Sequence, residues 1–447
     1  MAGVVVFGAV MGMLDTSLVN IGLRTIGNDL HAGLDAVQWV ASAYLLALAV
    51  ALPICSWLGR RVGVARLWLG ALVAFTIVSA LCALAPDVGV LIALRVLQGL
   101  AAGFLIPAGQ TLLGQAAGPK RMGRVMGIVG IAVVAAPAVG PTIGGLLLAH
   151  LSWQWLFLIN VPLGVVALVL GLRVLTKTAG SGHDRVDVIG LLLAGAGFSA
   201  VVYGVGNIAD AASVGPLLVW LPIVGGVIAI VAFVLRALRQ SKPLLDVRMF
   251  GNRVFAAANG ASFFAGAAMF GVSVLLPLYF QVVHGEGLVN SGLLLISYGL
   301  GGVVAFPLGG RLTDRVGGGV VAVVGNLVAA AVWAAFSLLD AHTNMLLLQP
   351  LLFIGGLAAG FVIMPLASAA YAAVRQDQVP DAAAFVNILQ RVGGAVAVAL
   401  VAVILSGATA STAVNYQFAF AAIAVSSVVA ALASAVLWRH ERRERRR

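Results

Sequence analysis

The chain has 447 residues, of which 62% are hydrophobic and 9% are charged. Soluble domains carry about 25% charged residues, so this composition excludes an ordinary soluble enzyme. The net charge is +11, from 26 Lys and Arg against 15 Asp and Glu. Because the basic residues lie in short groups between apolar runs, they do not form the basic face of a nucleic-acid-binding protein and instead indicate membrane topology.

Apolar segments long enough to cross a membrane follow one another along the whole chain. A spanning helix needs about 20 mostly apolar residues. The sequence therefore predicts fourteen spans, near 3–24, 37–58, 66–86, 88–110, 124–149, 153–174, 187–207, 215–236, 254–281, 290–311, 318–339, 345–371, 383–408 and 415–438. The first segment lacks the cleavage site of a signal peptide, so we expect it to be kept as a span.

The distribution of Lys and Arg tests this topology, because the spans are assigned from hydropathy alone. With a cytoplasmic N-terminus, all but three of the 26 basic residues fall in cytoplasmic loops or the tail; the exceptions are Arg24, Arg95 and Arg391. This asymmetry follows the positive-inside rule, so we expect both termini to be cytoplasmic. The tail, 439–447, is expected to bind anionic lipid or to serve as a simple flank of the last span.

Two loop segments indicate an internal repeat. Ser56–Gly63 follows the second span, Gly310–Gly317 follows the tenth, and both fit the pattern small-x-Leu-x-x-Arg-Val-Gly. We therefore predict a six-helix bundle over 1–175, a linker with two peripheral inserted spans over 176–245, and a second six-helix bundle over 246–438. Repeated helical halves are typical of secondary transporters, which bind substrate near the membrane midplane.

Seven short segments occur in order on the predicted spans: Leu14–Ile21, Gln38–Leu46, Arg95–Gly99, Gly140–Gly145, Ser152–Pro162, Leu244–Phe250 and Leu276–Gln281. In these segments the chain resembles the major facilitator superfamily, and specifically its fourteen-span drug/proton antiporters. The resemblance implies an all-α integral membrane protein of the bacterial cytoplasmic membrane that exports hydrophobic small molecules in exchange for protons. It implies a monomer without a cofactor, whose partners are the substrate, protons and membrane lipids.

Asp15 is the one acidic residue deep within a predicted span, and an intramembrane carboxylate is a functional candidate because its charge is costly in hydrocarbon. Counted from the outer helix ends, Asp15 and Arg95 lie at about 13 Å and 10 Å, and Gln98 shares a helix face with Arg95. We expect Asp15 to carry the coupling proton, with Arg95 and Gln98 modulating its charge. The alternative is a structural buried pair that fixes helix packing.

The two loop segments are expected to form a gate at the cytoplasmic side. In the second half Asp314, beside Arg315, can pair across helices, and Gly310 and Gly317 permit a tight turn. The first half has Arg60, Arg61 and Gly63, and Arg60 stands where the resemblance implies an aspartate. This exchange puts a latch in the first half in question, and these Arg residues could simply be topology determinants.

The fifth span carries Gly140-Pro141-x-x-Gly144-Gly145, preceded by Pro137. The spacing gives a smooth small-residue face and a bend, which we expect to pack closely against the other half and seal the cavity.

Other polar and aromatic residues in the spans are candidates for lining a substrate cavity: Asn20, Gln38, Trp39, Tyr44, Gln110, Asn259, Phe263, Tyr279, Gln281, Asn387 and Arg391. Arg391 is a cation without an acid in its own span, so it is expected either to bind an anionic group or to extend toward the membrane surface. The scarcity of membrane carboxylates argues for neutral, monocationic or anionic substrates.

Four other functions compete with export of a range of drugs. A membrane enzyme is disfavoured because the sequence has no HExxH, no clustered acids and no metal-ligand spacing of Cys or His. A proton-coupled importer or lipid exporter on the same fold is an alternative, as is an exporter of a narrow natural cargo such as a self-made antibiotic. A degenerate, non-transporting sensor is suggested by Arg60 and by Gln154.

Overall fold

The computed structural model describes residues 2–118, 121–175, 187–208, 215–240, 243–339, 343–406 and 412–445. Within these ranges the chain forms helices and no strand. The first half consists of α1 (Ala2–Asp29), α2 (Leu34–Val62), α3 (Val64–Ala83), α4 (Val88–Ala117), α5 (Met122–His150), α6 (Trp155–Leu158) and α7 (Asn160–Val174). Two further helices follow, α8 (Val188–Gly206) and α10 (Pro216–Arg239).

The second half begins after a short 3-10 segment, η2 (Val247–Gly251). Its helices are α11 (Arg253–Leu278) with the π-turn η3 (Tyr279–Val283), α12 (Leu288–Leu294), α13 (Ile296–Val316), α14 (Gly318–Phe336), α15 (Met345–Gly360), α16 (Ile363–Ala372), α17 (Val379–Ser406) and α18 (Thr412–Arg445), with η4 (Gln376–Gln378) before α17. Several predicted spans are thus two consecutive helices, as at α12 with α13 and α15 with α16.

Thirteen helices in the described part of the chain are long and apolar enough to cross a membrane, and each matches a predicted span. The 29-residue helix α5 occupies the position of the remaining predicted span. The protein is therefore a multi-pass, all-helical membrane protein.

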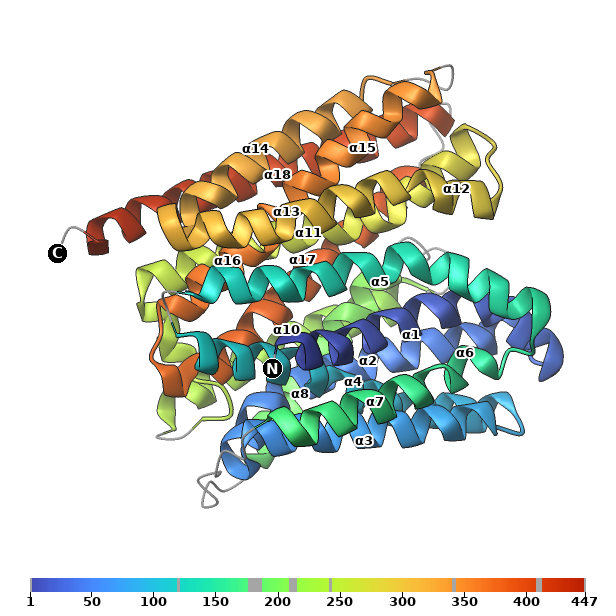
Figure 1. The fold of residues 1–447 in the computed structure, drawn as a ribbon, viewed down its shortest axis with the longest axis horizontal. Coiled ribbons are helices and arrows are strands. Elements are labelled where there is room, and N and C mark those ends of the chain that lie inside the picture. The colour runs from blue at the N-terminus through green and yellow to red at the C-terminus, as the bar shows by residue number, and fades with distance from the viewer. Residues whose placement is uncertain are drawn as a thin grey trace.

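The helices form two bundles that lie side by side along their length (Figure 1). Helices α1 to α7 make one bundle and α11 to α18 the other, with α5 and α13 in extensive contact between them. The C-terminus lies at the far left of Figure 1 and the N-terminus nearer its middle. We call the left side, where α5 begins and α13 and α18 end, the termini end of the molecule. The largest buried apolar cluster draws residues from both bundles, so the two halves share one core.

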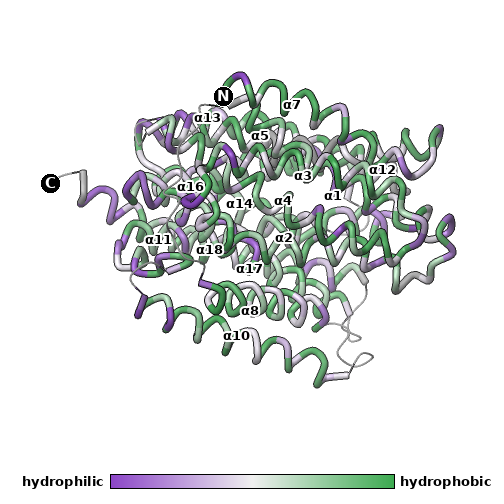
Figure 2. Tube along the Cα trace, turned by 90° about the horizontal axis from the view of Figure 1, so that it is seen from below, coloured by the Kyte–Doolittle hydropathy of each residue, from purple (hydrophilic) through white to green (hydrophobic). Residues whose placement is uncertain are grey.

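The two inserted helices pack against each other, with α10 at the edge of the molecule (Figure 2). Both were expected to be peripheral; α10 touches few other elements, whereas α8 has exposed residues but also contacts both bundles. Helix α8 packs on α2 and on α17, where Val201 and Val205 contact Ala399. Because apolar faces toward lipid and toward protein look alike in sequence, hydropathy did not separate the two cases.

Two helix boundaries differ from prediction in ways that matter for function. Helix α17 begins at Val379, earlier than the predicted 383, which brings Asp381 into its first turn. Helix α18 continues to Arg445, so most of the predicted basic tail prolongs the last helix.

Candidate functional site

Asp15 lies fully buried in the middle of α1, and both of its carboxylate oxygens accept hydrogen bonds from described side chains. Oδ2 accepts from Arg95 Nη1 at 2.6 Å. Oδ1 accepts from Gln98 Nε2 at 3.0 Å and from Asn160 Nδ2 at 2.9 Å. The structure thus brings the predicted trio together, and adds Asn160.

Several hydrogen bonds and a ring contact hold the guanidinium of Arg95 beside Asp15. Its Nε donates to the carbonyl of Val40 at 3.0 Å, and its Nη1 also donates to Gln98 Oε1 at 2.7 Å. The guanidinium lies 4.0 Å from the centre of the Tyr44 ring, a favourable cation–π arrangement in a site closed to water. Arg95 is 1% exposed, so its charge is balanced by Asp15 and these neighbours rather than by solvent.

Asn160 and Ser79 complete the network, and the sequence patterns did not identify either of them. Ser79 Oγ accepts from Gln98 and from Asn160, each at 3.1 Å, and donates to the carbonyl of Phe157 at 2.9 Å. Asn160 lies within the motif segment Ser152–Pro162, but the motif assigns no role to its amide. The signal that could have identified Asn160 is that it is a polar residue within the mostly apolar sixth predicted span.

Asn160 also has an unused acceptor. Its Oδ1 is buried and has no hydrogen-bond partner among the described residues. Buried polar groups are nearly always hydrogen-bonded, so an unpaired acceptor next to a carboxylate calls for a physical reason. If Asp15 is protonated, a half-turn of the Asn160 amide presents this oxygen as an acceptor for the new O–H.

At the termini end, Asp314 in the last turn of α13 caps a helix of the first bundle. Its Oδ1 accepts from the Gly123 amide at 2.8 Å and its Oδ2 from the Arg124 amide at 3.1 Å. The N-cap residue of α5, Arg121, supplies no side-chain cap, so the carboxylate from the other bundle satisfies the free amides and the positive helix end. Arg315 and Arg61 are exposed.

At the corresponding position of the repeat, Arg60 forms an ion pair with Asp381 in the first turn of α17. Arg60 Nη2 also donates to the carbonyl of Leu244 at 3.1 Å, and Asp381 Oδ2 accepts from the Asp246 amide at 3.1 Å. Arg60 put a latch of the first half in question, but in the structure it forms an ionic contact between the bundles. The first bundle supplies the cation, Arg60, at the position where the second has Asp314, and the acidic partner, Asp381, lies on α17 of the other bundle.

A third contact joins the bundles further into the protein. Gln110 Oε1 on α4 accepts from Asn387 Nδ2 on α17 at 2.7 Å and from the Tyr371 hydroxyl on α16 at 3.1 Å. Gln110 and Asn387, two predicted cavity residues, thus meet directly across the interface. Together with Arg60 and Asp314, they hold the bundles together at the termini end.

The loop glycines divide between two roles. Gly63 and Gly317 have φ of 92° and 102°, a backbone conformation that favours glycine, and so form the predicted tight turns. Gly310 lies within α13 and not in the turn, and its Cα faces the backbone of Gly123, where no larger side chain fits.

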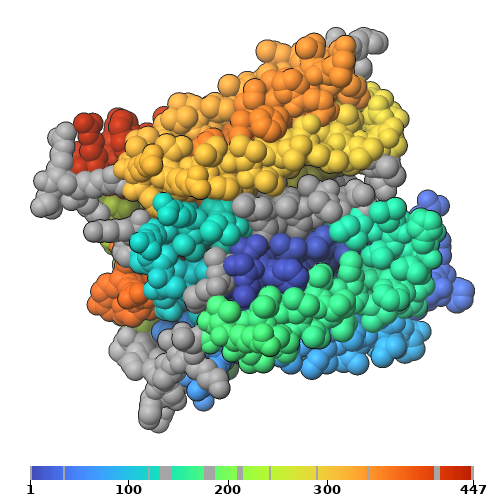
Figure 3. Space-filling model, viewed as in Figure 1, coloured from blue at the N-terminus to red at the C-terminus, as the bar shows by residue number. Residues whose placement is uncertain are grey.

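The small-residue face of α5 that meets the other bundle is not the predicted one. A Cβ on Gly140 would meet Ser17, and one on Gly144 would meet Leu18 at 3.2 Å, so both glycines pack on α1 of their own bundle. The face toward α13 is formed by Gly123, Gly127 and Gly130, and Figure 3 shows the start of α5 pressed against α13. The side chains of Pro137 and Pro141 lie outside the described residues, and Gly145 is exposed.

This packing gives a first testable expectation. A Cβ at Gly127 would lie 2.5 Å from the carbonyl oxygen of Phe306, so Gly127→Val must separate α5 from α13. We expect the variant to fold as two intact bundles but to lose closure at the termini end. Increased labelling of an engineered cysteine at Thr313, which is buried in α13, measures the opening; unchanged labelling would contradict it. Gly145→Val, at an exposed glycine, is the matched control.

The remaining predicted cavity residues lie in different surroundings. Asn20 and Gln38 are exposed, and Trp39 is 44% exposed and stacks on Tyr203 of α8 at 6.4 Å. Asn259 is buried and donates to the Phe255 carbonyl. Phe263, Gln281 and Arg391 are half-buried, whereas Tyr279 packs in an aromatic cluster with Phe336, Tyr416 and Phe420.

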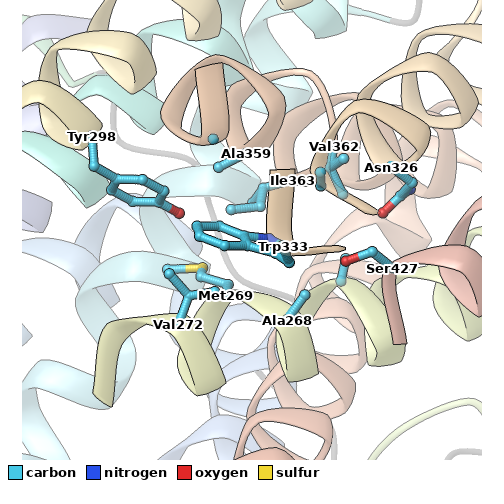
Figure 4. A pocket seen from close by; sticks show the side chains of 13 residues that line it. Ala268, Met269, Val272, Tyr298, Asn326, Trp333, Ala359, Val362, Ile363 and Ser427 are labelled. Carbon is cyan, nitrogen blue, oxygen red and sulfur yellow. The ribbon is translucent and has the colours of Figure 1, made fainter. Parts of the chain in front are cut away.

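The second bundle carries no equivalent of the Asp15 network among its described residues. Gly99–Phe104 and Gly356–Phe361 have the same sequence, Gly-Leu-Ala-Ala-Gly-Phe, and Gly99 and Gly356 pack on the carbonyls of Tyr44 and Tyr298 respectively. Gln98 then corresponds to Gly355 and Arg95 to Leu352. In place of the charges, the second bundle has a small cavity lined by Met269, Tyr298, Trp333 and Ser427 (Figure 4).

Comparison with known proteins agrees with this architecture. Residues 5–398 match the family model of the Major Facilitator Superfamily. The human organic anion transporter MFSD10 superposes with a TM-score of 0.69 at 12% identity, covering 97% of this chain and 98% of its own. The xylose symporter XylE superposes with a TM-score of 0.64 at 14% identity, covering 96% and 94%. The chain therefore belongs to the Major Facilitator Superfamily, a family of transporters and not of enzymes.

Its sequence relatives lie among the drug-efflux members of that family. The Multidrug resistance protein B homolog of Mycobacterium tuberculosis (strain ATCC 25618 / H37Rv) is 35% identical over 91% of this chain and 76% of its own. The Puromycin resistance protein pur8 of Streptomyces alboniger is 33% identical over 91% and 82%.

Proposed function

We infer that this protein is a proton-coupled antiporter of the bacterial cytoplasmic membrane that exports hydrophobic small molecules by alternating access. The observation that carries this proposal is the buried Asp15, bound by Arg95, Gln98 and Asn160 in the middle of a membrane-spanning bundle. An ionisable group at that depth is expensive and marks ion pathways. The relatives named for multidrug and puromycin resistance support the direction of transport and the kind of cargo.

The side chains around Asp15 allow it to bind and release a proton. As a carboxylate it is neutralised by Arg95 and receives three hydrogen bonds. As a carboxylic acid it would leave Arg95 with the Gln98 oxygen, the Val40 carbonyl and the Tyr44 ring, and could donate to the free oxygen of Asn160. Each state of the carboxyl group thus has hydrogen-bond partners. In the protonated state, however, Arg95 keeps only neutral partners, so the proton changes the charge balance of the site.

The bundles are joined at the termini end, which we take as the cytoplasmic side because the basic loop residues lie there. In an outward-facing state of this transport cycle, Arg60–Asp381, Asp314 and Gln110–Asn387 would close the inner gate. The ion pair of Arg60 supports a working latch and argues against a degenerate sensor. The proton gradient would supply the energy, and the transporter would act as a monomer without a cofactor.

The test is gradient-driven transport of a panel of fluorescent lipophilic dyes in proteoliposomes, comparing the wild type with Asp15→Asn. Because Asn mimics a permanently protonated Asp, we expect the variant to lose accumulation driven by the proton gradient while still exchanging dye down its own gradient. Each proton contributes about 2.3 kcal/mol per 100 mV of membrane potential, so the lost accumulation should be large.

The matched control is Asp87→Asn. Asp87 is exposed at the N-cap of α4 and accepts from the Val90 amide at 2.9 Å, a role that asparagine fills equally well. Its transport should equal that of the wild type. Gradient-driven accumulation that survives in Asp15→Asn would contradict the assignment of the proton to this residue.

A further inference from the structure

Arg391 is a cation in the interior of a membrane span that the proton network does not use. It follows the start of α17 by twelve residues, about 18 Å along the helix, and so lies near the middle of the span. Among the described residues, it has neither a hydrogen bond nor an ion pair, although Arg95, at similar depth, is bonded on every side. A charge at this depth ordinarily needs a partner.

The neighbours of Arg391 on its own helix show which way it faces. Asn387, one turn before, contacts Gln110 of α4, and Ala395, one turn after, packs in the cluster with Val201 of α8. Residues four apart share a helix face, so Arg391 lies between a residue that faces the first bundle and one that faces α8. Helix α17 packs on α2 and α4 of the first bundle as well as on α8. Arg391 therefore faces the interface between the bundles.

It does not face the apolar surface of its own helix. The exposed residues Val396 and Leu400 lie about 140° and 180° around α17 from Arg391. Arg391 itself is half-buried, so part of its side chain is exposed. An arginine that extended along lipid to the membrane surface would lie on the exposed stripe, which argues against that alternative.

None of the described acids forms an ion pair with Arg391. In the described helices only Asp15 lies near mid-span; the acid of α17, Asp381, lies in the first turn and is paired with Arg60. Both oxygens of Asp15 are already bonded to Arg95, Gln98 and Asn160. The charge of Arg391 therefore has no counter-ion among the described residues.

We propose that Arg391 binds the anionic group of a lipophilic organic anion, such as an aromatic carboxylate or sulfonate, between the two bundles. The planar guanidinium suits a carboxylate or sulfonate because it can donate two parallel hydrogen bonds. Phe263 of α11, which is half-buried and whose carbonyl lies against Gly393 of α17, offers aromatic surface for the rest of the molecule. The cargo is thus an amphiphile with one negative charge, which deepens the proposed export function and rests on it only for the direction of transport.

Two probes with one scaffold test the charge requirement. Anilinonaphthalene sulfonate is an anion, and N-phenylnaphthylamine is the same aromatic framework without the sulfonate. Binding is measured on the purified full-length protein in detergent as the probe concentration that gives half of the maximal rise in Tm. This readout needs no proton gradient, so it is independent of the transport assay for Asp15.

We expect Arg391→Gln to raise the half-saturating concentration of the sulfonate by about tenfold or more, as loss of a hydrogen bond to a charged group implies. Binding of the neutral probe should not change. Arg391→Lys keeps the charge and should retain most of the sulfonate binding. Equal sulfonate binding by the wild type and Arg391→Gln, or binding of the neutral probe alone by the wild type, would overturn the proposal.

A second measurement uses the wild type and so does not depend on the folding of a variant. Phenylglyoxal modifies accessible arginines, and mass spectrometry of the peptide containing Arg391 reports its extent. The sulfonate should protect Arg391 and the neutral probe should not, whereas exposed Arg66 should react equally in all samples. Absence of protection by the sulfonate would count against the site. Protection combined with failure of gradient-driven transport would refute the antiport function and leave the anion site intact.

Discussion

Arg60→Asp is expected to abolish most transport, and the double variant Arg60→Asp with Asp381→Arg to restore much of it. The single change places two carboxylates against each other at the buried start of α17, where Asp381 is 5% exposed. Like charges in such a site repel strongly, and the bundles must separate to relieve them. Exchanging the residues restores the attraction with the opposite orientation.

Transport in proteoliposomes measures the loss and the rescue. The distance between spin labels at exposed positions Arg61 and Arg375, one on each bundle, should increase in the single variant and return in the double variant. Arg61→Asp is the matched control, since Arg61 is exposed and contacts the Trp57 ring rather than an acid. If the double variant is no better than Arg60→Asp alone, the pair is not the latch.

Arg95→Leu is expected to be the most destabilising of the single substitutions considered. It leaves Asp15 buried with no cation, and removing one member of a buried ion pair costs about 3–5 kcal/mol. It also leaves the Val40 carbonyl and the Gln98 oxygen without their donor. We expect a marked fall in Tm in detergent and no gradient-driven transport.

The double variant Asp15→Asn with Arg95→Leu separates the charge effect from lost packing. Because it removes both charges, its fall in Tm should be smaller than the sum of the falls of the two single variants. Arg66→Leu, at an exposed arginine, should leave the Tm nearly unchanged. Additive losses in the double variant would mean that the ion pair contributes little to stability.

Much of the architecture could be predicted from local pattern. The length of the apolar runs is set by the thickness of the bilayer, so the spans follow from hydropathy. Asp15, Arg95 and Gln98 could be grouped from their positions in the sequence, because an isolated acid at mid-span must face protein and find a cation. The repeated loop segment likewise identified Arg60 and Asp314 as equivalent positions.

The partners across the bundles could not be predicted in the same way. In a membrane protein, the faces toward lipid and toward protein are both apolar, so periodicity does not show which helix a face meets. For this reason Gly140 was expected to pack on the other bundle and not on α1. The contacts of α8 with both bundles and the role of Asn160 were not predicted either. The sequence by itself determined the spans, the internal repeat and the solitary acid. Only the tertiary structure decided that Asp381 pairs with Arg60 and that Asn160 completes the proton site. It alone also decided that Arg391 faces the interface without a partner among the described residues. Each of these features depends on contacts between residues far apart in the chain.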